Sequence, residues 1–213
     1  MDPTEFVRAH TTLGTSPDLP EIRLHMASDA FALWERTERE SGGDTVSAPP
    51  FWAFPWAGGQ ALARYLLDHR DEVRGRTVLD LAAGSGLVAI AAARAGAAGV
   101  TATEIDPYAA AAIALNAQVN DVKVDVCLGD VLDDDTGAEV VLAGDVFYSH
   151  AMGERVLAFL VRARGRGARV LVGDPGRAYL PRNRLTAVAT REVPVPRALE
   201  DAEVKRTTVW RLA

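Results

Sequence analysis

One stretch decides the fold of this chain: VLDLAAGSGLVAI, which spans residues 78–90. An apolar run, a glycine turn and the apolar start of a helix follow one another without a gap. This order predicts a strand, a tight turn and a helix, the first unit of a nucleotide-binding α/β domain. Gly84 and Gly86 lack a Cβ, so the backbone can turn sharply and approach a ligand closely. The helix that opens near Gly86 directs free N–H groups into the turn.

Two classes of ligand fit this turn. Residues 84–89, GSGLVA, match the dinucleotide pattern G-x-G-x-x-A, and Glu104 follows about 20 residues later, where an acid binds a ribose. The glycines alone therefore do not separate NAD from S-adenosylmethionine. Asp80 favours S-adenosylmethionine, because a carboxylate at the strand end repels a pyrophosphate but attracts an ammonium and a sulfonium. An Asp80 that only caps the next helix is compatible with either ligand.

Length and composition indicate one globular unit. The chain has 213 residues, 48% of them hydrophobic and 24% charged, and a net charge of −6 that argues against a general nucleic-acid binder. We see no signal peptide and no apolar run long enough for a membrane span, and we expect a cytoplasmic monomer without membrane contact. The chain has a single cysteine, Cys127, which excludes an internal disulfide and a Cys-rich zinc site. We expect this thiol to be buried and inert. No His/Cys cluster predicts a metal.

We expect two regions, an N-terminal helical extension over residues 1–50 that packs on the core and a ligand-binding domain over residues 51–213. The extension is expected to contain, in order, a short helix, a loop, a strand, a longer helix and a turn-rich linker, over residues 3–12, 14–20, 21–26, 29–40 and 41–50.

The segment PFWAFPWAGGQ, residues 50–60, places four aromatic side chains within six residues and ends on Gly-Gly. It could be a hydrophobic plug under the sheet or one wall of a ligand pocket. We favour the pocket wall, because Pro and Gly place the segment outside regular structure and Trp offers a large flat area. An amphipathic helix is expected over residues 59–69.

Strand and helix patterns then alternate. Strands are expected over residues 77–81, 99–103, 125–128, 140–143 and 169–172, and helices over residues 86–95, 107–119 and 150–164. This alternation predicts an α/β fold with a parallel sheet and helices on both faces. Two strand-like runs, 190–195 and 204–212, have only a loop between them and should pair antiparallel. Such a layout is that of the seven-strand, Rossmann-like methyltransferases, and the NAD fold lacks it.

Ligands of open α/β sheets bind above the carboxyl ends of the strands. The first strand places residues 80–86 there, and the second places Glu104, which can accept both ribose hydroxyl protons. Asp106, followed by Pro107, is better explained as a helix cap. Asp130 follows the third strand and is expected to accept a hydrogen bond from the adenine amino group, with a solvated loop acid as the alternative.

The fourth strand ends on the sequence GDVFY, residues 144–148, which should face the methyl group of the donor. Asp145, Phe147 and Tyr148 would form a narrow charged slot suited to an amine, since aromatic faces tolerate a methylated ammonium. Asp145 can orient the amine and accept its proton, directly or through water. His150 is a rival base, but we expect it to begin a helix.

Arg177 and Tyr179 follow the fifth strand and end over the same edge of the sheet. They could contact a protein substrate or anchor their loop, and the sequence leaves both readings open.

These motifs resemble a known group. DLAAGSG at residues 80–86 and DVFY at residues 145–148 resemble the family 16 class I methyltransferases, whose signature after the fourth strand is acid-x-x-Tyr/Phe. More narrowly, three segments are similar to the electron transfer flavoprotein β-subunit lysine methyltransferases: FWAFPWAGGQALARYLLD, GDPGRAYLP and EDAEVKRTTVW, at residues 51–68, 173–181 and 200–210. The resemblance runs from about Pro20 to the C-terminus.

The resemblance implies methylation of a lysine on the electron transfer flavoprotein β subunit, with S-adenosylmethionine as donor and S-adenosylhomocysteine as product. It implies that Asp145 and Tyr148 are catalytic and line the lysine entry. The expected cofactor-binding residues are Trp56, Asp80, Ala82, Gly84, Gly86, Glu104, Ile105, Asp130, Gly144 and Asp145. The expected substrate-binding residues are Phe147, Tyr148, Arg177 and Tyr179.

One departure from the family pattern leaves the substrate open. Ser149 stands where the family often has Asp, which leaves the number of methyl groups added and the exact substrate undetermined. The alternatives are an N-methyltransferase acting on a small amine or a ribosomal protein, an NAD-binding module, and a catalytically silent S-adenosylmethionine sensor.

Overall fold

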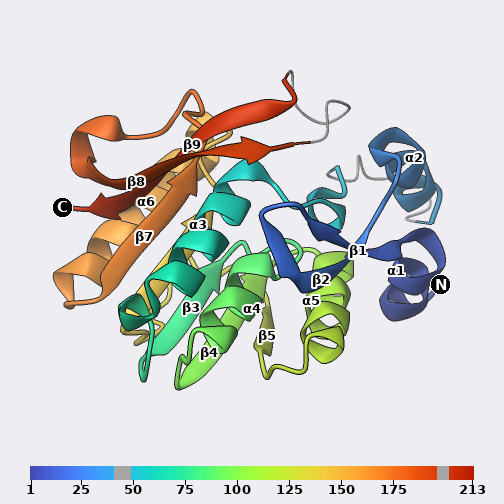
Figure 1. Cartoon of the computed structure of the whole chain (residues 1–213), viewed down its shortest axis with the longest axis horizontal. Helices are drawn as coiled ribbons and strands as arrows, with labels where there is room; N and C mark the ends of the chain where they lie inside the picture. The colour runs from blue at the N-terminus through green and yellow to red at the C-terminus, as the bar shows by residue number, and fades with distance from the viewer. Residues whose placement is uncertain (41–48, 196–201) are drawn as a thin grey trace.

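The structure is a computed structural model that describes residues 1–40, 49–195 and 202–213. Most of the expected linker over residues 41–50, and Glu200 and Asp201 of the third family-like segment, lie outside these residues. A seven-stranded sheet in the order β5-β4-β3-β6-β7-β9-β8 forms the centre of the protein (Figure 1). Five strands are parallel: β3 (Thr77–Leu81), β4 (Gly99–Glu104), β5 (Asp125–Leu128), β6 (Val140–Gly144) and β7 (Arg169–Asp174). The predicted fold class is confirmed.

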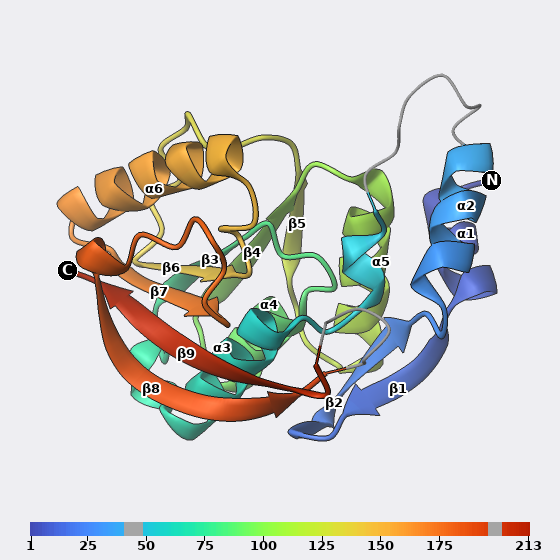
Figure 2. The same ribbon diagram turned by 90° about the horizontal axis from the view of Figure 1, so that it is seen from above.

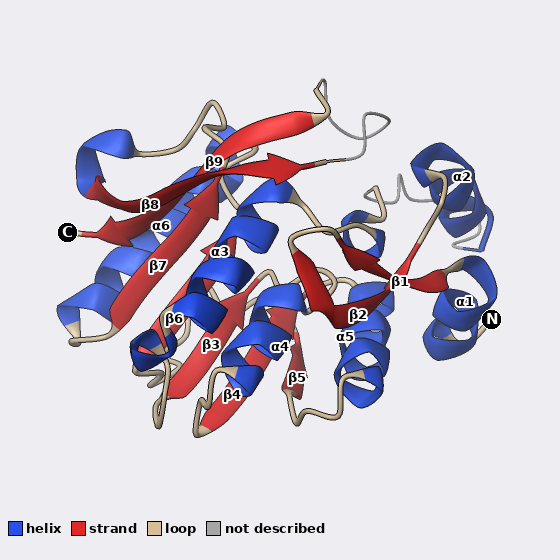
Figure 3. Cartoon of the chain, in the orientation of Figure 1, coloured by secondary structure: helices blue, strands red, loops and turns tan. Residues whose placement is uncertain are grey.

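Helices cover both faces of the sheet. α3 (Ala57–Asp68), α4 (Leu87–Arg94) and α5 (Pro107–Val119) lie on one face, and α6 (His150–Gly165) lies on the other (Figures 2 and 3). Successive side chains of a strand point to opposite faces. Val78 accordingly packs with the cluster under α3 and α4, whereas Leu79 and Leu81 pack with the cluster under α6. Asp80 lies on the same face as Val78, so its side chain points toward α4, the helix that follows the glycine turn.

The C-terminal hairpin is antiparallel, as predicted. β8 (Leu185–Pro194) pairs with β9 (Val204–Leu212), and β9 in turn pairs antiparallel with β7. β8 begins five residues before the expected run at Thr190, because its first part alternates weakly and is defined by its pairing with β9. The described residues also contain three short 3-10 turns, η1 (Phe51–Ala53), η2 (Arg70–Glu72) and η3 (Arg182–Arg184).

The N-terminal extension contains more strand than expected. Its elements are α1 (Pro3–His10), β1 (Thr12–Ser16), β2 (Leu19–Met26) and α2 (Ala30–Glu40). The loop expected over residues 14–20 is wrong, since β1 and β2 form an antiparallel hairpin there. The sequence of β1, TLGTS, has little apolar alternation, and the pairing of its backbone with β2 makes it a strand. The extension packs on α5 and η1, where Phe6 and Val7 of α1 are fully buried against Trp52.

Cys127 is exposed, and the expectation of a buried thiol is wrong. It lies on β5, the strand at one edge of the sheet, where three of the four residues are exposed. A sequence pattern for a strand does not show whether that strand lies at the centre or at the edge. None of the helices in the described ranges is long and apolar enough to cross a membrane.

Candidate active site

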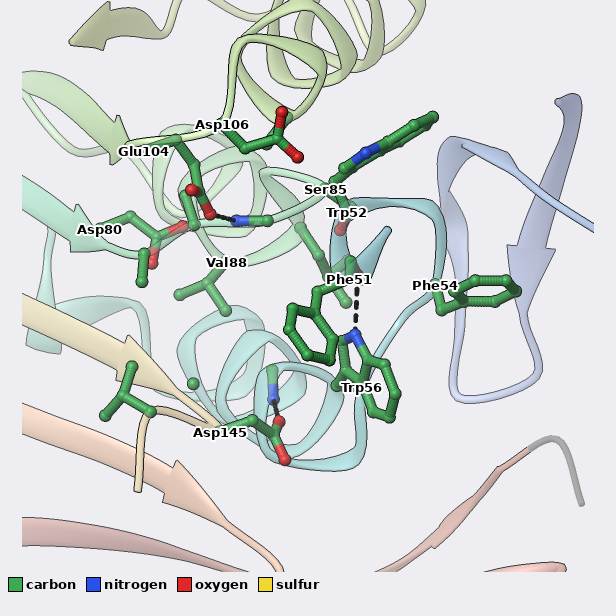
Figure 4. A pocket seen from close by; sticks show the side chains of 18 of the residues that line it. Phe51, Trp52, Phe54, Trp56, Asp80, Ser85, Val88, Glu104, Asp106 and Asp145 are labelled. Carbon is green, nitrogen blue, oxygen red and sulfur yellow. Dashed lines mark hydrogen bonds between the residues drawn. The ribbon is translucent and has the colours of Figure 1, made fainter. Parts of the chain in front are cut away.

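A cavity of about 270 Å³ lies at the carboxyl ends of β3, β4 and β6 (Figure 4). Three segments form its walls: the aromatic segment before α3, the turn after β3 and the loop after β6. Besides Arg177, its lining includes nine of the expected site residues: Trp56, Asp80, Ala82, Gly84, Glu104, Ile105, Gly144, Asp145 and Tyr148. Arg177, from the loop after β7, also lines it. The topology therefore brings together residues that span more than half of the chain.

Asp80 both lines this cavity and binds the following helix. Its side chain is buried, and its Oδ2 accepts a hydrogen bond of 2.9 Å from the N–H of Ala89 in the first turn of α4. Burial raises the pKa of Asp80 to about 8, a rise that the Ala89 N–H opposes and the nearby Glu104 carboxyl increases. A bound cation favours the ionised form of such a buried acid. Asp80 is therefore suited to a positively charged ligand and unsuited to a diphosphate.

The turn after β3 depends on left-handed backbone conformations. Ala82, Gly84 and Gly86 have φ values of 52°, 55° and 76°. Gly84 lines the cavity and Gly86 does not, so the assignment of Gly86 to the cofactor stays a prediction. A Cβ on Gly86 would lie 3.1 Å from Cγ2 of Ile113, and this glycine instead allows α4 and α5 to pack closely. A positive φ is sterically unfavourable for a residue with a Cβ, such as Ala82, and not for glycine. The sequence does not predict this conformation at Ala82.

Glu104 is held against the turn by two backbone groups. Its Oε1 accepts a hydrogen bond of 2.7 Å from the N–H of Gly84 (Figure 4). Its Oε2 accepts one of 3.0 Å from the N–H of Ile105. Burial raises the pKa of Glu104, and these two N–H groups oppose the rise. A carboxylate is an acceptor with two oxygens, which suits a pair of ribose hydroxyls. Asp106 caps α5 as predicted, through the N–H of Tyr108 at 2.8 Å.

The four aromatic residues of the segment before α3 all contribute to the cavity, as predicted, although in two different ways. Trp52 and Phe54 are buried in the cluster that joins the extension to α5, so they also act as the plug that was the alternative reading. Trp56 donates from its Nε1 to the carbonyl oxygen of Phe51 at 2.7 Å (Figure 4). The ring of Phe51 lies 5.6 Å from that of Tyr148, which closes an aromatic rim over the cavity.

Asp145 sits at the meeting point of three elements. It follows β6 with a φ of 57°, and its Oδ2 accepts a hydrogen bond of 3.0 Å from the N–H of Gly59 at the start of α3. Its Oδ1 accepts bonds from Nε and Nη2 of Arg177, at 3.0 and 2.6 Å. Burial raises the pKa of Asp145 to about 6, although Arg177 and the Gly59 N–H lower it. Gly59 is not among the expected site residues, although the Gly-Gly pair at the start of the helix is a signal for it in the sequence.

Three other expected site residues lie away from the cavity. Phe147 is buried in the core under α6, where it packs in the same cluster as its neighbour Val146. Asp130 is exposed, and its carboxylate bonds the Leu132 N–H at 3.0 Å and Arg155 of α6 at 2.8 Å. Tyr179 is 45% exposed, and its ring contacts that of His150, which begins α6 as predicted. The direct substrate role of Phe147 and the adenine role of Asp130 are therefore not supported by this geometry.

Comparisons with known proteins decide between the remaining ligand classes. The chain is 40% identical over 180 residues to the electron transfer flavoprotein beta subunit lysine methyltransferase of Xenopus laevis, covering 83% of this chain and 71% of that protein. It is 34% identical over 214 residues to the protein of the same name from Rattus norvegicus, covering 96% of this chain and 82% of that protein.

The chain belongs to the electron transfer flavoprotein beta subunit lysine methyltransferase family. This methyltransferase also matches the family model of ribosomal protein L11 methyltransferase (PrmA) over residues 60–145. It is 32% identical over 161 residues to the ribosomal protein L11 methyltransferase of Geobacter sulfurreducens, covering 65% of this chain and 53% of that protein.

Solved structures agree on the fold of the methyltransferase. The magnesium protoporphyrin IX methyltransferase of Synechocystis PCC 6803 with bound SAM has a TM-score of 0.54 at 15% identity, over 73% of this chain and 78% of that chain. The ribosomal protein L11 methylase of Lactobacillus delbrueckii subsp. bulgaricus has a TM-score of 0.50 at 21% identity, over 73% of this chain and 79% of that chain. The NAD-binding alternative is set aside by the identity of 34–40% to the lysine methyltransferases.

The cofactor of this enzyme is S-adenosylmethionine, and the residues present fit it. Buried acids on β3 and β4 meet the positive charge and the ribose, and the left-handed turn brings backbone close to the ligand. The methyltransferase is an N-methyltransferase, with Asp145 and an aromatic rim at the end of the cavity that β6 provides.

Proposed function

We propose that this enzyme methylates a lysine side chain on the β subunit of electron transfer flavoprotein. The observation that carries the proposal is the identity of 34–40% to methyltransferases named for that substrate, over most of this chain. The match to the Rattus norvegicus protein covers 96% of this chain and so includes the aromatic segment and the loop over residues 174–179, two parts of the site that lie outside the cofactor turn. Substrate preference is set by such loops on a shared scaffold.

The chain contributes position and desolvation to the reaction. Asp80 and Glu104 hold the cofactor from the sheet side, and Phe51, Trp56 and Tyr148 exclude water from the other side. When bound, S-adenosylmethionine would supply an electrophilic methyl group to the lone pair of the lysine nitrogen, with S-adenosylhomocysteine as the leaving group. The Oδ2 of Asp145 accepts a hydrogen bond from the lysine nitrogen, because the Gly59 N–H fills only one of the two lone-pair positions of this oxygen.

A ribosomal protein is the second candidate substrate, because the L11 methyltransferase family model matches residues 60–145. That range contains the cofactor turn and ends at Asp145, but it contains neither the aromatic segment before α3 nor the loop after β7. The match is thus concentrated in the cofactor-binding region, which methyltransferases with different substrates share. It is therefore weaker support for a ribosomal protein as the substrate.

The test is methyl transfer from labelled S-adenosylmethionine to three acceptors in parallel: purified electron transfer flavoprotein, ribosomal protein L11, and a panel of small amines. We expect label on the flavoprotein β subunit, and mass spectrometry of its peptides then identifies the lysine and the number of methyl groups. Asp145→Asn is the control, which should bind the cofactor but lose most of the turnover. Label only on L11 or on a small amine would overturn the proposal, and label on no protein would favour a silent sensor.

We also propose that the enzyme works as a monomer in the cytoplasm, in line with its acidic composition and with the absence of a membrane-spanning helix among the described helices. Light scattering of the purified protein and fractionation of cells that produce it at native level test these two points. A dimer mass or recovery with membranes would contradict them.

A further inference from the structure

The Arg177 guanidinium is held in the active site by several contacts. Nε and Nη2 both bond Oδ1 of Asp145, and the side chain is 21% exposed. Its Cζ lies 5.8 Å from the ring centre of Trp56, so the cation also faces an aromatic wall of the cavity. The backbone N–H of Arg177 donates to Oδ1 of Asp174 at 2.7 Å, which fixes the turn that carries it.

This arrangement uses the two oxygens of Asp145 unequally. Oδ1 takes two bonds from Arg177, whereas Oδ2 takes one bond from the Gly59 N–H. A carboxylate oxygen offers about two acceptor positions, so one position remains at Oδ2. An acceptor nitrogen that bonds there meets a carboxylate already neutralised by a fixed cation.

The charge of that cation matters for the acceptor. A lysine must lose a proton before its nitrogen has a lone pair to react, and an unpaired carboxylate beside it would favour the unreactive ammonium form. A carboxylate paired with a guanidinium gives no such preference, and the guanidinium itself repels a second cation. The pair still accepts a hydrogen bond, which a neutral amine can donate.

We propose that Arg177 is a positioning residue for methyl transfer: its fixed guanidinium neutralises Asp145, so that the acceptor lysine binds at Oδ2 as a neutral amine. The lysine ammonium releases its proton to solvent on entry, and the amine keeps the lone pair that forms the new bond. This inference rests on the proposed function, in which the acceptor is a lysine.

Other charged groups around Asp145 do not replace Arg177. Asp174, at the end of β7, is buried and raises the pKa of Asp145, so it opposes ionisation. Arg182 lies in the same loop and acts on Asp174, but no bond of the described residues joins it to Asp145. The remaining titratable groups nearby are Asp80 and Glu104, which line the cavity from β3 and β4, Tyr148 at its rim, and His150, which faces Glu154 on α6.

The test compares Arg177→Gln, which removes the charge, with Arg177→Lys, which keeps it. We expect the acid limb of the pH–rate profile on electron transfer flavoprotein to move up by about one unit or more in Arg177→Gln, roughly a tenfold loss at neutral pH. Arg177→Lys should keep the wild-type limb at a reduced rate. Arg182→Gln is the matched control, with the same charge change in the same loop and an expected unchanged profile.

A second readout needs neither turnover nor the flavoprotein. Carbon NMR of the Asp145 carboxyl, assigned by its loss in Asp145→Asn, should show a pKa near 6 in the wild type and a higher one in Arg177→Gln. An unmoved Asp145 titration, or an equal loss in Arg177→Gln and Arg177→Lys at every pH, would overturn the inference. Failure of the wild type to methylate the flavoprotein would overturn the proposed substrate, while the NMR titration would still report on the pair.

Discussion

The backbones of Gly58 and Gly173 are in direct contact: a Cβ built on either residue would overlap the carbonyl oxygen of the other. The start of α3 therefore rests on the end of β7 with no side chain between them. This contact brings the N–H of Gly59 within 3.0 Å of Oδ2 of Asp145. Two glycines far apart in the sequence thus set the position of the acid that faces the acceptor.

Gly173→Ala should destabilise the protein, because neither backbone can yield without moving α3. We expect a loss of about 1–3 kcal/mol in the free energy of unfolding, measured by urea denaturation. Gly59→Ala is the matched control, since its Cβ would meet Val88 Cγ2 at an ordinary 3.8 Å. Equal losses in the two variants would contradict the proposed contact.

Asp80→Asn should change the pH dependence of stability in the ligand-free protein. With a folded pKa of about 8, Asp80 keeps a proton that the unfolded chain loses above about pH 4, so wild-type stability falls as pH rises between these values. The variant lacks this loss. Its Tm relative to wild type should therefore rise from pH 5 to pH 8. The expected rise is roughly 2–4 °C for each kcal/mol of unfolding free energy that the wild type loses over this range.

Asp80→Asn should also weaken S-adenosylmethionine binding at least tenfold in calorimetry, since the charge that meets the cofactor is lost. A Tm difference that stays constant from pH 5 to pH 8 would show that Asp80 is ionised in the free protein. Unchanged cofactor affinity would remove Asp80 from the binding site.

Glu104→Gln should weaken cofactor binding by about 1.5–3 kcal/mol, because the new amide N–H₂ must face either a ribose hydroxyl or one of the two backbone N–H groups that Glu104 now accepts from. Calorimetry with S-adenosylmethionine measures the loss. Asp130→Asn is the comparison, and we expect less than about a twofold change, because Asp130 bonds Arg155 on the surface. A large effect at Asp130 would restore its predicted role at the adenine.

Phe147→Ala and Tyr148→Ala should separate stability from activity. Phe147 is buried under α6, so its truncation should cost about 3–5 kcal/mol of unfolding free energy. Tyr148 is 48% exposed at the rim, so its truncation should leave the Tm nearly unchanged and raise the KM for the protein substrate. Thermal melts and initial rates check both, and a stable, impaired Phe147→Ala would mean that this ring does reach the substrate.

Much of the fold could be predicted, because its signals are local. The strand over residues 125–128 and the helix over residues 107–119 match β5 and α5 in their bounds. β1 was missed because its few residues alternate weakly and depend on β2 for their hydrogen bonds. Cys127 was placed inside the protein for a similar reason, since local sequence does not reveal which strand becomes an edge.

The candidate site was predicted in its position and only partly in its members. The rule that ligands bind at the carboxyl ends of parallel strands placed Asp80, Glu104 and Asp145 correctly around one cavity. The same rule admitted Phe147 and Asp130, because being near a strand end does not show which way a side chain points. Phe147 turns into the core, and Asp130 turns toward an arginine of α6.

The sequence by itself determined the order of strands and helices, the glycine turn and the acid in front of it, since each depends on neighbours within a few residues. Only the tertiary structure decided that Arg177 pairs with Asp145, that Gly58 meets Gly173 and that Glu104 holds the N–H of Gly84. These contacts join residues 20 to more than 100 positions apart. Their geometry follows from how the helices pack on the sheet, and no local pattern carries that information.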